Sequence, residues 1–488
     1  METRKPRITF IAAPFDGTYE DGAEFLLKVS EKLKEDFHLS YVTMFKTIHD
    51  IFKSKGVGCT YLPDKLGDYY LPTGLPHPYR ATELHQKHLT AIEEKYGCCV
   101  EEILVGDYDQ DHSNRREAME NLIKTFWFWE EHIREQKPEY IIGSGQRYIN
   151  LIAHTLCKKR DTKFLVMSPS PFPNTFYLTE DLRGRFPELN QQVELNYGAE
   201  LSNAEEETAK RYIKSIINTD KRYFQPDSTP HLNAAKIKFF LGRAHKSFFI
   251  EQLRTPYSKP WRGAYNYALK MIRSKVAKTI YSKPDYTEKY IFFPLHVEWD
   301  SPILVWNPLF INQLFLIKII ARSLPSDTTL YVKEHISDIG GTPLTQLKKI
   351  QDTPKVKLIN PQEDSHKLIK NSEIVLVIAG TAGWEGVLME KPVISVGNTY
   401  YSKLTWNVRD LTQLQDTIKK ARKGTKADTE EVYKFIAAFQ KRINPGNISF
   451  TQLYYSNKSN REQMLSEENI EKVAEGIRRG LEGLNNGG

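Results

Sequence analysis

Short apolar runs alternate with segments of helical apolar spacing in the first third of the chain. Residues 8–13 have the pattern of a buried strand, and residues 23–33 have that of an amphipathic helix. Apolar residues 140–142 then precede a turn, Gly143-Ser144-Gly145, a helix and a second apolar run at residues 164–167. This order predicts an α/β domain.

The alternation becomes regular after residue 290. Apolar runs of four or five residues are separated by helical segments, which favours a mainly parallel sheet with right-handed crossovers. Two such domains in tandem would bind ligands at the carboxyl ends of their strands. The predicted strands are residues 290–293, 329–332, 356–359, 374–378 and 393–396, and the chain is expected to be helical from residue 412 onward.

We place the domain boundary after residue 283. Residues 1–283 form the predicted N-terminal α/β domain, and residues 284–488 form a C-terminal α/β domain that ends in helices. Residues 56–116 have weak periodicity and many Tyr, Pro, Gly and His residues, so we predict an insertion or a long functional loop there.

Composition narrows the class of protein. The chain has 488 residues, of which 40% are hydrophobic and 26% charged, and this excludes wholesale disorder. The apolar run at residues 8–13 is too short for a signal-peptide core, and polar residues interrupt residues 303–321. The four cysteines form no CxxC pair, which fits a reducing compartment. We therefore expect a cytoplasmic protein.

The net charge of +7 is concentrated in one segment. Residues 231–283 contain 12 Lys and Arg residues against one acid, Glu251. This mixture of cations and aromatic rings suits an anionic surface such as phospholipid headgroups, a phosphorylated glycolipid or nucleic acid. The alternative is a solvated helical face whose aromatic rings pack inward. The interleaved rings are Phe239, Phe240, Phe248, Phe249, Tyr257, Trp261, Tyr265 and Tyr267.

The strongest chemical signal follows the apolar run at residues 374–378. The sequence Ala379-Gly380-Thr381-Ala382-Gly383-Trp384-Glu385 predicts a small-residue turn that leads into a helix. Backbone amides and the helix dipole would then form an anion site suited to a nucleotide phosphate. Glu385 would bind ribose hydroxyls. The alternative is that Thr381 caps the helix and Glu385 complements its dipole.

Two other strand ends carry ionisable residues. Lys333 and His335 share one side of an extended chain and could hold a phosphate, with His335 stabilising a leaving group. His296 and Glu298 are placed in the same way and suit substrate binding or acid–base catalysis. An ordinary charge cluster, or a histidine with structural hydrogen bonds, would explain either pattern.

A carboxylate near the first strand is the candidate general base. Asp21 follows that strand within Glu20-Asp21-Gly22 and could reach an acceptor hydroxyl, although a surface acid would have the same pattern.

Metal motifs are incomplete. Asp107, Asp109 and Asp111 start like a calcium loop, but His112 stands where glycine is needed. His85 and His88 lack a further recognisable zinc ligand. We predict a metal-independent reaction and no cofactor.

The motifs together resemble a known family. Residues 292–296, 332–335, 380–385 and 391–394 resemble the capsule polysaccharide biosynthesis protein family in their order and spacing. Residues 142–148 and 170–176 resemble the family more loosely, and the resemblance spans roughly residues 138–401. Ile336 follows His335 where the family often has proline.

The resemblance implies two Rossmann-like domains in the GT-B arrangement and a glycosyltransferase that makes a surface polysaccharide or glycolipid. Relatives include transferases that use CMP-activated 3-deoxy-octulosonic acid. The second domain would bind the nucleotide sugar, and the first would bind the acceptor. The resemblance implies that the regions of His335 and of residues 380–385 hold the nucleotide donor. Together with the residue patterns above, it leads us to predict the site residues. They are, for nucleotide binding, Lys333, His335, Gly380, Thr381, Ala382, Gly383, Trp384 and Glu385; for substrate binding, Gly143, Ser144, Gly145, Arg147 and Glu298; and for catalysis, Asp21, His296 and His335.

The expected partners follow from this reading. They are a CMP-linked or UDP-linked sugar, a polysaccharide or glycolipid acceptor and, at the inner face of the cell membrane, anionic lipid; nucleic acid is not expected. Two alternatives are a sugar-nucleotide epimerase of the same architecture and a non-catalytic polysaccharide assembly or export factor. Donor identity, acceptor and stereochemical outcome are open.

Overall fold

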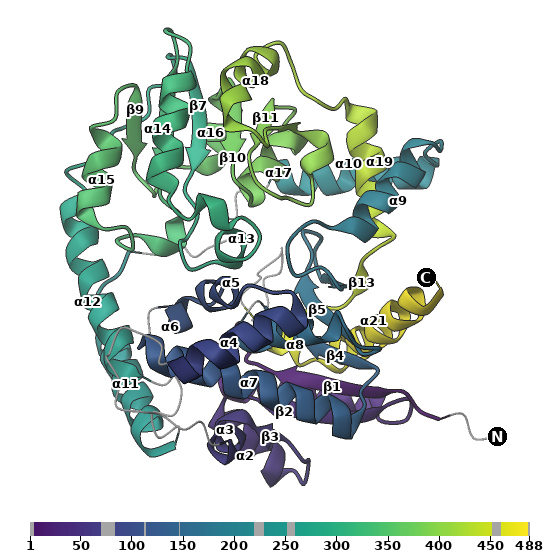
Figure 1. Cartoon of the computed structure of the whole chain (residues 1–488). Helices are drawn as coiled ribbons and strands as arrows, with labels where there is room; N and C mark the ends of the chain where they lie inside the picture. The colour runs from purple at the N-terminus through teal and green to yellow at the C-terminus, as the bar shows by residue number, and fades with distance from the viewer. Residues whose placement is uncertain are drawn as a thin grey trace. The chain divides into compact units, whose positions relative to one another are not determined.

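A computed structural model of the chain describes residues 4–69, 83–111, 114–145, 147–218, 229–250, 259–450 and 460–486 (Figure 1). The chain forms two compact units. Unit 1 comprises Met1–Leu182, Leu241–Pro260 and Ile443–Gly488, and unit 2 comprises Arg183–Phe240 and Trp261–Arg442. The units interleave along the sequence, whereas the sequence predicts a single boundary after residue 283.

Unit 1 contains a sheet in the order β13-β6-β5-β4-β1-β2-β3. Strands β1 to β5 pair in parallel, whereas β6 pairs antiparallel with both β5 and β13. Apolar residues of the strands and of helix α1 share one buried core. The strands are β1 (Arg7–Ala12), β2 (His38–Thr43), β3 (Thr60–Tyr61), β4 (Tyr140–Gly143), β5 (Lys163–Pro169), β6 (Thr175–Thr179) and β13 (Asn444–Pro445).

The C-terminal segment belongs to unit 1 because its apolar residues complete that core. Strand β13 extends the sheet beyond β6, and helix α21 (Glu467–Asn486) packs against α1 (Tyr19–Leu33). Ile470 and Ile477 of α21 are fully buried there. Contacts between residues so distant in sequence have no local pattern, and this explains the misplaced boundary.

Helices occupy most of the segment that the sequence predicts as an insertion or long loop. The described parts of residues 56–116 contain α3 (Leu62–Asp68), α4 (Glu83–Tyr96), α5 (Val100–Val105) and α6 (Tyr108–Asp111), and α4 packs on α7 (Arg115–Gln136). These helices are short and bury few side chains, so their periodicity is weak. His112 lies outside the described residues.

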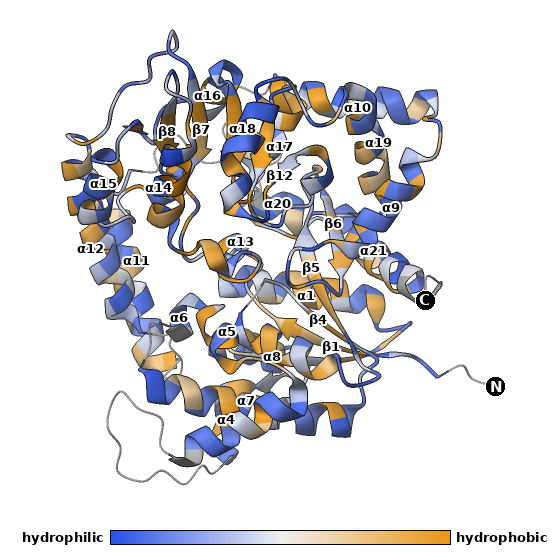
Figure 2. Cartoon of the chain, turned by 45° about the horizontal axis from the view of Figure 1, so that its top comes forward, coloured by the Kyte–Doolittle hydropathy of each residue, from blue (hydrophilic) through white to orange (hydrophobic). Residues whose placement is uncertain are grey.

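Unit 2 contains a fully parallel sheet in the order β12-β11-β10-β7-β8-β9. Alternate strand residues face opposite sides, and in the central strands β7 and β10 both sets are buried, so these strands are continuous apolar runs. Figure 2 shows the hydrophobic colouring of β7 and β8. The strands are β7 (Tyr290–Pro294), β8 (Thr329–Lys333), β9 (Val356–Ile359), β10 (Ile374–Val377), β11 (Val393–Ser395) and β12 (Trp406–Asn407).

Two groups of helices cover this sheet. Helices α14 (Gln313–Ser323), α15 (Leu344–Gln351) and α18 (Leu414–Ala421) bury their apolar residues with one set of strand side chains. Helices α16 (Ser365–Asn371) and α17 (Thr381–Leu388) pack together, and α10 (Asn203–Ile217) contacts α17 and α19 (Thr429–Gln440). The predicted α/β class, with two Rossmann-like domains and C-terminal helices, is confirmed.

The basic aromatic segment is helical where it is described. It contains α11 (Ala234–His245), a π-helical turn at Lys246–Ile250 and α12 (Pro260–Ala277); Tyr257 lies outside the described residues. Among the helices that the structure describes, none combines the length and the apolar character needed to cross a membrane.

Candidate nucleotide site in unit 2

The candidate site lies where the parallel strands β7, β8 and β10 of unit 2 end. The segments that leave these strands carry His296, Lys333 with His335, and Gly380. Since parallel strands present their carboxyl ends at one edge of a sheet, these residues gather at that edge.

The turn after β10 exposes the beginning of α17. Gly380 is the N-cap residue, with φ of 92°, and no side chain caps the helix. Thr381 is the first helical residue and not the cap, contrary to the alternative interpretation of the sequence. The first amides of an α-helix lack partners within the helix, and the helix dipole favours an anion beside them. The N-terminal end of α17 is therefore chemically suited to bind a phosphate.

Glycines shape this turn because a buried tyrosine lies against it. The Tyr401 hydroxyl donates a hydrogen bond of 2.5 Å to the Gly380 carbonyl oxygen. A Cβ atom on Gly383 would lie 2.3 Å from the same hydroxyl oxygen. One on Gly386 would lie 3.0 Å from a methyl group of Val393 in β11. The glycines at 383 and 386 allow the helix to approach Tyr401 and the sheet.

His296 supports the other side of the turn. Its Nε2 atom accepts a hydrogen bond of 3.2 Å from the Ala379 amide, and its backbone exchanges two hydrogen bonds with the Gln313 side chain. Burial lowers the pKa of His296 to about 4. The neutral ring with an accepting Nε2 carries its proton on Nδ1. These contacts fit a positioning role, and the catalytic role stays a prediction.

His335 has the opposite tautomer. The Ser337 amide donates to Nδ1 over 3.3 Å, and the Ser337 hydroxyl lies 2.6 Å from the same atom. Burial, and secondly the charge of Lys333, lower the pKa of His335. The neutral ring therefore carries its proton on Nε2, where it can donate to an anion.

Lys333 and Glu334 lie on opposite sides of the end of β8. The Lys333 ammonium group donates to the Ser365 hydroxyl over 2.8 Å at the start of α16, and the side chain is almost fully buried. Glu334 is buried too and accepts a hydrogen bond from the Tyr281 hydroxyl. Burial raises the pKa of Glu334. The sequence analysis did not identify Glu334 as a buried structural residue.

Glu385 has a histidine partner that the sequence analysis missed. His366 Nε2, in the first turn of α16, lies 3.5 Å from the Glu385 carboxylate. The hydrogen bond to Glu385 raises the pKa of His366. The first turn of α16 and the second turn of α17 thus contribute an acid–imidazole pair to the site.

Two predicted ligand residues lie elsewhere in unit 2. Trp384 is buried, donates from Nε1 to the Tyr212 hydroxyl over 2.9 Å, and packs against Tyr401 and Phe435. Trp384 is therefore a core residue on the buried face of α17. Glu298 is exposed and lines a separate cavity of about 340 Å³ beside Gln346.

A family match covers the part of the chain that contains this site. Residues 246–440 match the family described as "Capsule polysaccharide biosynthesis protein". The match covers less than half of the chain, and it makes this segment similar to that family. The resemblance seen in the motifs is thereby confirmed over residues that include His296, Lys333, His335 and the turn at Gly380. No curated protein matches the chain.

Several solved structures are similar at low identity. The beta Kdo 2,7 transferase of Thermosulfurimonas dismutans KpsC is 14% identical, with coverage of 72% of this chain and 95% of that chain and a TM-score of 0.38. The beta Kdo 2,4 transferase of the same KpsC is 13% identical, with coverage of 67% and 88% and a TM-score of 0.35. Methanocaldococcus jannaschii UDP-GlcNAc 2-epimerase is 11% identical, with coverage of 90% and 100% and a TM-score of 0.29.

Outside the capsule-family segment, the turn after β4 in unit 1 is held by its own polar contacts. The Asn150 side chain donates 2.8 Å hydrogen bonds to the carbonyls of Ser144 and Gly145, and Gly145 has φ of 71°. A Cβ atom on Gly143 would lie 2.8 Å from the Asn150 carbonyl oxygen. The two glycines and Asn150 are explained by the backbone conformation of this turn. Substrate binding by the turn stays a prediction.

Arg147 binds the carboxylates of the incomplete metal motif. Its guanidinium donates to Asp109 over 3.0 Å and lies 3.6 Å from Asp107. Asp107 also accepts a 3.0 Å hydrogen bond from the Tyr148 amide at the start of α8 (Tyr148–Cys157). Among the residues that the structure describes, no group of three His, Cys, Asp or Glu side chains is placed to hold a metal ion.

Asp21 has a structural role at the start of α1. It forms a capping box with Thr18, and Arg461 donates to its carboxylate over 2.6 Å. Burial alone would raise the pKa of Asp21, but hydrogen bonds from Thr18 and Arg461 hold it below its ordinary value. A carboxylate with a lowered pKa is a weak base, so these contacts disfavour Asp21 as the catalytic base.

Proposed function

We propose that the protein is a glycosyltransferase that moves a sugar from a nucleotide-sugar donor to a growing capsular or surface polysaccharide or glycolipid. The observation that carries this proposal is the uncapped end of α17 at Gly380, inside the segment that matches the capsule family. A nucleotide diphosphate or monophosphate would accept hydrogen bonds from the first amides of this helix.

The surrounding side chains would contact the phosphate and ribose groups of the donor. His335 would donate from Nε2 to a phosphate oxygen, and the Lys333 charge would stabilise the leaving phosphate. The carboxylate of Glu385 would accept hydrogen bonds from ribose hydroxyls while His366 orients it. The donor is a CMP-linked or UDP-linked sugar, and the reaction needs no metal ion in this proposal.

Thermal unfolding in the presence of CMP, UDP, GDP, ADP and dTDP tests the donor site. A ligand at about 100 times its Kd adds about 2.7 kcal/mol to the free energy of unfolding when it binds only the folded state. We expect one nucleotide to raise Tm selectively in the native chain and to lose this effect in His335→Ala and Glu385→Ala. Glu430→Ala, an exposed change on α19 in the same unit, is the matched control.

The outcomes separate the candidate functions. Stabilisation by one nucleotide, followed by acceptor-dependent release of that nucleotide from its sugar, supports the transferase. Conversion of the nucleotide sugar without an acceptor would instead assign an epimerase. If no nucleotide raises Tm, the donor site is refuted, and a non-catalytic assembly factor becomes the better interpretation.

As part of this proposal, we place the enzyme in the cytoplasm at the inner face of the membrane. The basic aromatic segment at residues 231–283 supports this location because its charge is complementary to anionic lipid.

A further inference from the structure

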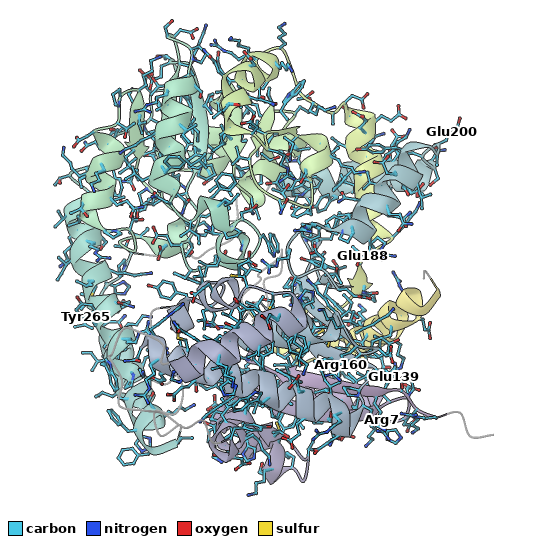
Figure 3. All side chains as sticks on the ribbon, viewed as in Figure 1. Arg7, Glu139, Arg160, Glu188, Glu200 and Tyr265 are labelled. Carbon is cyan, nitrogen blue, oxygen red and sulfur yellow. The ribbon has the colours of Figure 1, made fainter. Side chains whose placement is uncertain are left out.

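Helix α12 exposes an apolar stripe along its length. Trp261, Tyr265, Ile272 and Val276 are 51%, 64%, 61% and 45% exposed, respectively. Their spacing of four or seven residues places them on one face of the helix. Tyr265 is labelled on α12 in Figure 3. Large apolar side chains gathered in this way are typical of an interaction surface.

The charge around the stripe is uniformly positive. Lys275 and Lys278 are exposed beside it, and no acidic residue occurs between residues 259 and 283. In the preceding helix, Lys236 and Lys238 are exposed with Phe239. Aromatic and aliphatic side chains flanked by lysines match the interface of an anionic membrane, where rings enter the headgroup region and ammonium groups meet phosphates.

The opposite face of α12 binds the loop that follows His335. Lys270 forms an ion pair with Asp338, and Arg273 donates to the Gly341 carbonyl over 2.9 Å. Gly340 has φ of 76°, and a Cβ atom there would lie 2.3 Å from the Lys270 carbonyl oxygen. Asp338 is in turn bonded through its amide to the His335 carbonyl. One helix thus joins an exposed apolar stripe to a loop of the candidate nucleotide site.

We propose that the stripe of Trp261, Tyr265, Ile272 and Val276 docks on an anionic membrane surface, and that α12 couples this docking to nucleotide binding through the 336–341 loop. The docking deepens the membrane location in the proposed function and does not depend on the donor site, whereas the coupling rests on the donor site. By linkage, vesicles change the affinity for nucleotide by the same factor by which nucleotide changes the affinity for vesicles.

Flotation with vesicles in the absence of nucleotide tests docking. The full chain should bind vesicles that contain phosphatidylglycerol far better than neutral phosphatidylcholine vesicles, and salt should weaken this binding. Ile272→Glu and, separately, Tyr265→Glu should lower it at least about tenfold, because each removes apolar burial and adds a repelled charge. Leu195→Glu on α9 (Pro187–Tyr197), where the native leucine is 65% exposed, is the matched control.

Three outcomes would overturn the docking surface. They are equal binding to both kinds of vesicle, unchanged binding by both glutamate variants, and a dimer in sedimentation velocity that Ile272→Glu dissociates while no vesicle binds. The last result would assign the stripe to a second copy of the chain.

Nucleotide titrations with and without phosphatidylglycerol vesicles test the coupling. We expect the affinity for the stabilising nucleotide to change about fivefold or more on vesicles. Lys270→Met, which removes the ion pair to Asp338, should bring this ratio close to one, while Lys270→Arg and the exposed change Lys419→Met on α18 should retain it. A ratio of one in the native chain, or an unchanged ratio in Lys270→Met, would refute the coupling. Failure of any nucleotide to bind would refute the proposed function and the coupling that rests on it, and leave the docking result standing.

Discussion

The packing of Gly383 against Tyr401 yields a sharp prediction for the candidate nucleotide site. In Gly383→Ala, the new methyl group would lie 2.3 Å from the Tyr401 hydroxyl oxygen and 2.8 Å from a methyl group of Val377. Both neighbours are fully buried, so neither can move into solvent. Relief of the clash requires shifts of about 1 Å in a close-packed interior, which places the cost near the upper end of the overpacking range, about 3 kcal/mol.

The same substitution would disturb the turn that presents the helix amides. When the Tyr401 hydroxyl is displaced, it can no longer donate to the Gly380 carbonyl, which holds the N-cap residue of α17. Gly383→Ala should therefore weaken nucleotide binding as well as stability. Tyr401→Phe alone should cost about 1 kcal/mol because it removes the hydrogen bond to a partly buried carbonyl.

Calorimetry of the single and double variants is the assay. For a unit of about 240 residues, a loss of about 3 kcal/mol lowers Tm by roughly 6–12 °C. The double variant Gly383→Ala/Tyr401→Phe should cost less than the sum of the single changes by about 1–2 kcal/mol, because one clash is then absent. Gly263→Ala, where nothing lies within 4 Å of the new atom, is the matched control and should not lower Tm. A Tm within about 2 °C of the native value in Gly383→Ala, or strictly additive costs, would refute this reasoning.

The remaining predictions concern protonation and helix capping. Glu385→Gln should lower the pKa of His366, and a histidine NMR titration would measure this change. Because Glu385 raises this pKa in the folded chain, the pair stabilises the fold below about pH 6.5. This stabilisation is lost as the pH rises through the raised pKa. His296 has the opposite sign, because burial lowers its pKa to about 4. Its contribution to the free energy of unfolding is present above about pH 6.5 and is lost as the pH falls through 4. The Tm of His296→Gln should therefore depend less on pH between these values than the Tm of the native chain. Nucleotide binding should raise the lowered pKa of His335, because a phosphate beside Nε2 favours the protonated ring. A histidine NMR titration in which nucleotide leaves this pKa unchanged would contradict a contact between the ring and the phosphate. Asp107→Ala should lower stability by about 1–3 kcal/mol by removing a buried acceptor at the start of α8, and added Ca²⁺ or Mg²⁺ should not raise the Tm of the native chain if this carboxylate is a cap and not a metal ligand.

The sheet of unit 2 could be predicted from sequence almost to the residue. The central strands β7 and β10 are buried on both faces and are continuous apolar runs. The edge strand β9 contains Lys357, and the predicted run at residues 356–359 still coincides with it. The two-residue strands β12 and β13 could not be predicted in this way. They are too short for a pattern, and β13 pairs with a strand more than 260 residues earlier in the chain.

The candidate site was predictable only where its residues follow strands directly. Gly380, His335 and His296 belong to that group, and the structure brings them to one edge of the sheet. His366 and Tyr401 do not, because their roles arise from contacts with Glu385 and Gly380 that cross between segments. The motif at residues 380–385 spans little more than one helical turn, so its sequence does not show which side chains face the core. For this reason the sequence analysis placed the buried Trp384 among the predicted ligand residues.

The acidic candidates show why a carboxylate after a strand is a weak guide to catalysis. The amides at the start of a helix attract carboxylates as strongly as they attract ligands, and Asp21 and Asp107 each satisfy such amides. The start of α17 differs because Gly380 has no side chain with which to cap it. In unit 2, the neighbouring His296 and His335 rings have lowered pKa values, so at neutral pH they add hydrogen-bonding atoms but little charge. Under the proposed function, an arriving phosphate would therefore supply the negative charge that aspartates supply at α1 and α8, and nucleotide recognition would depend on the uncapped helix.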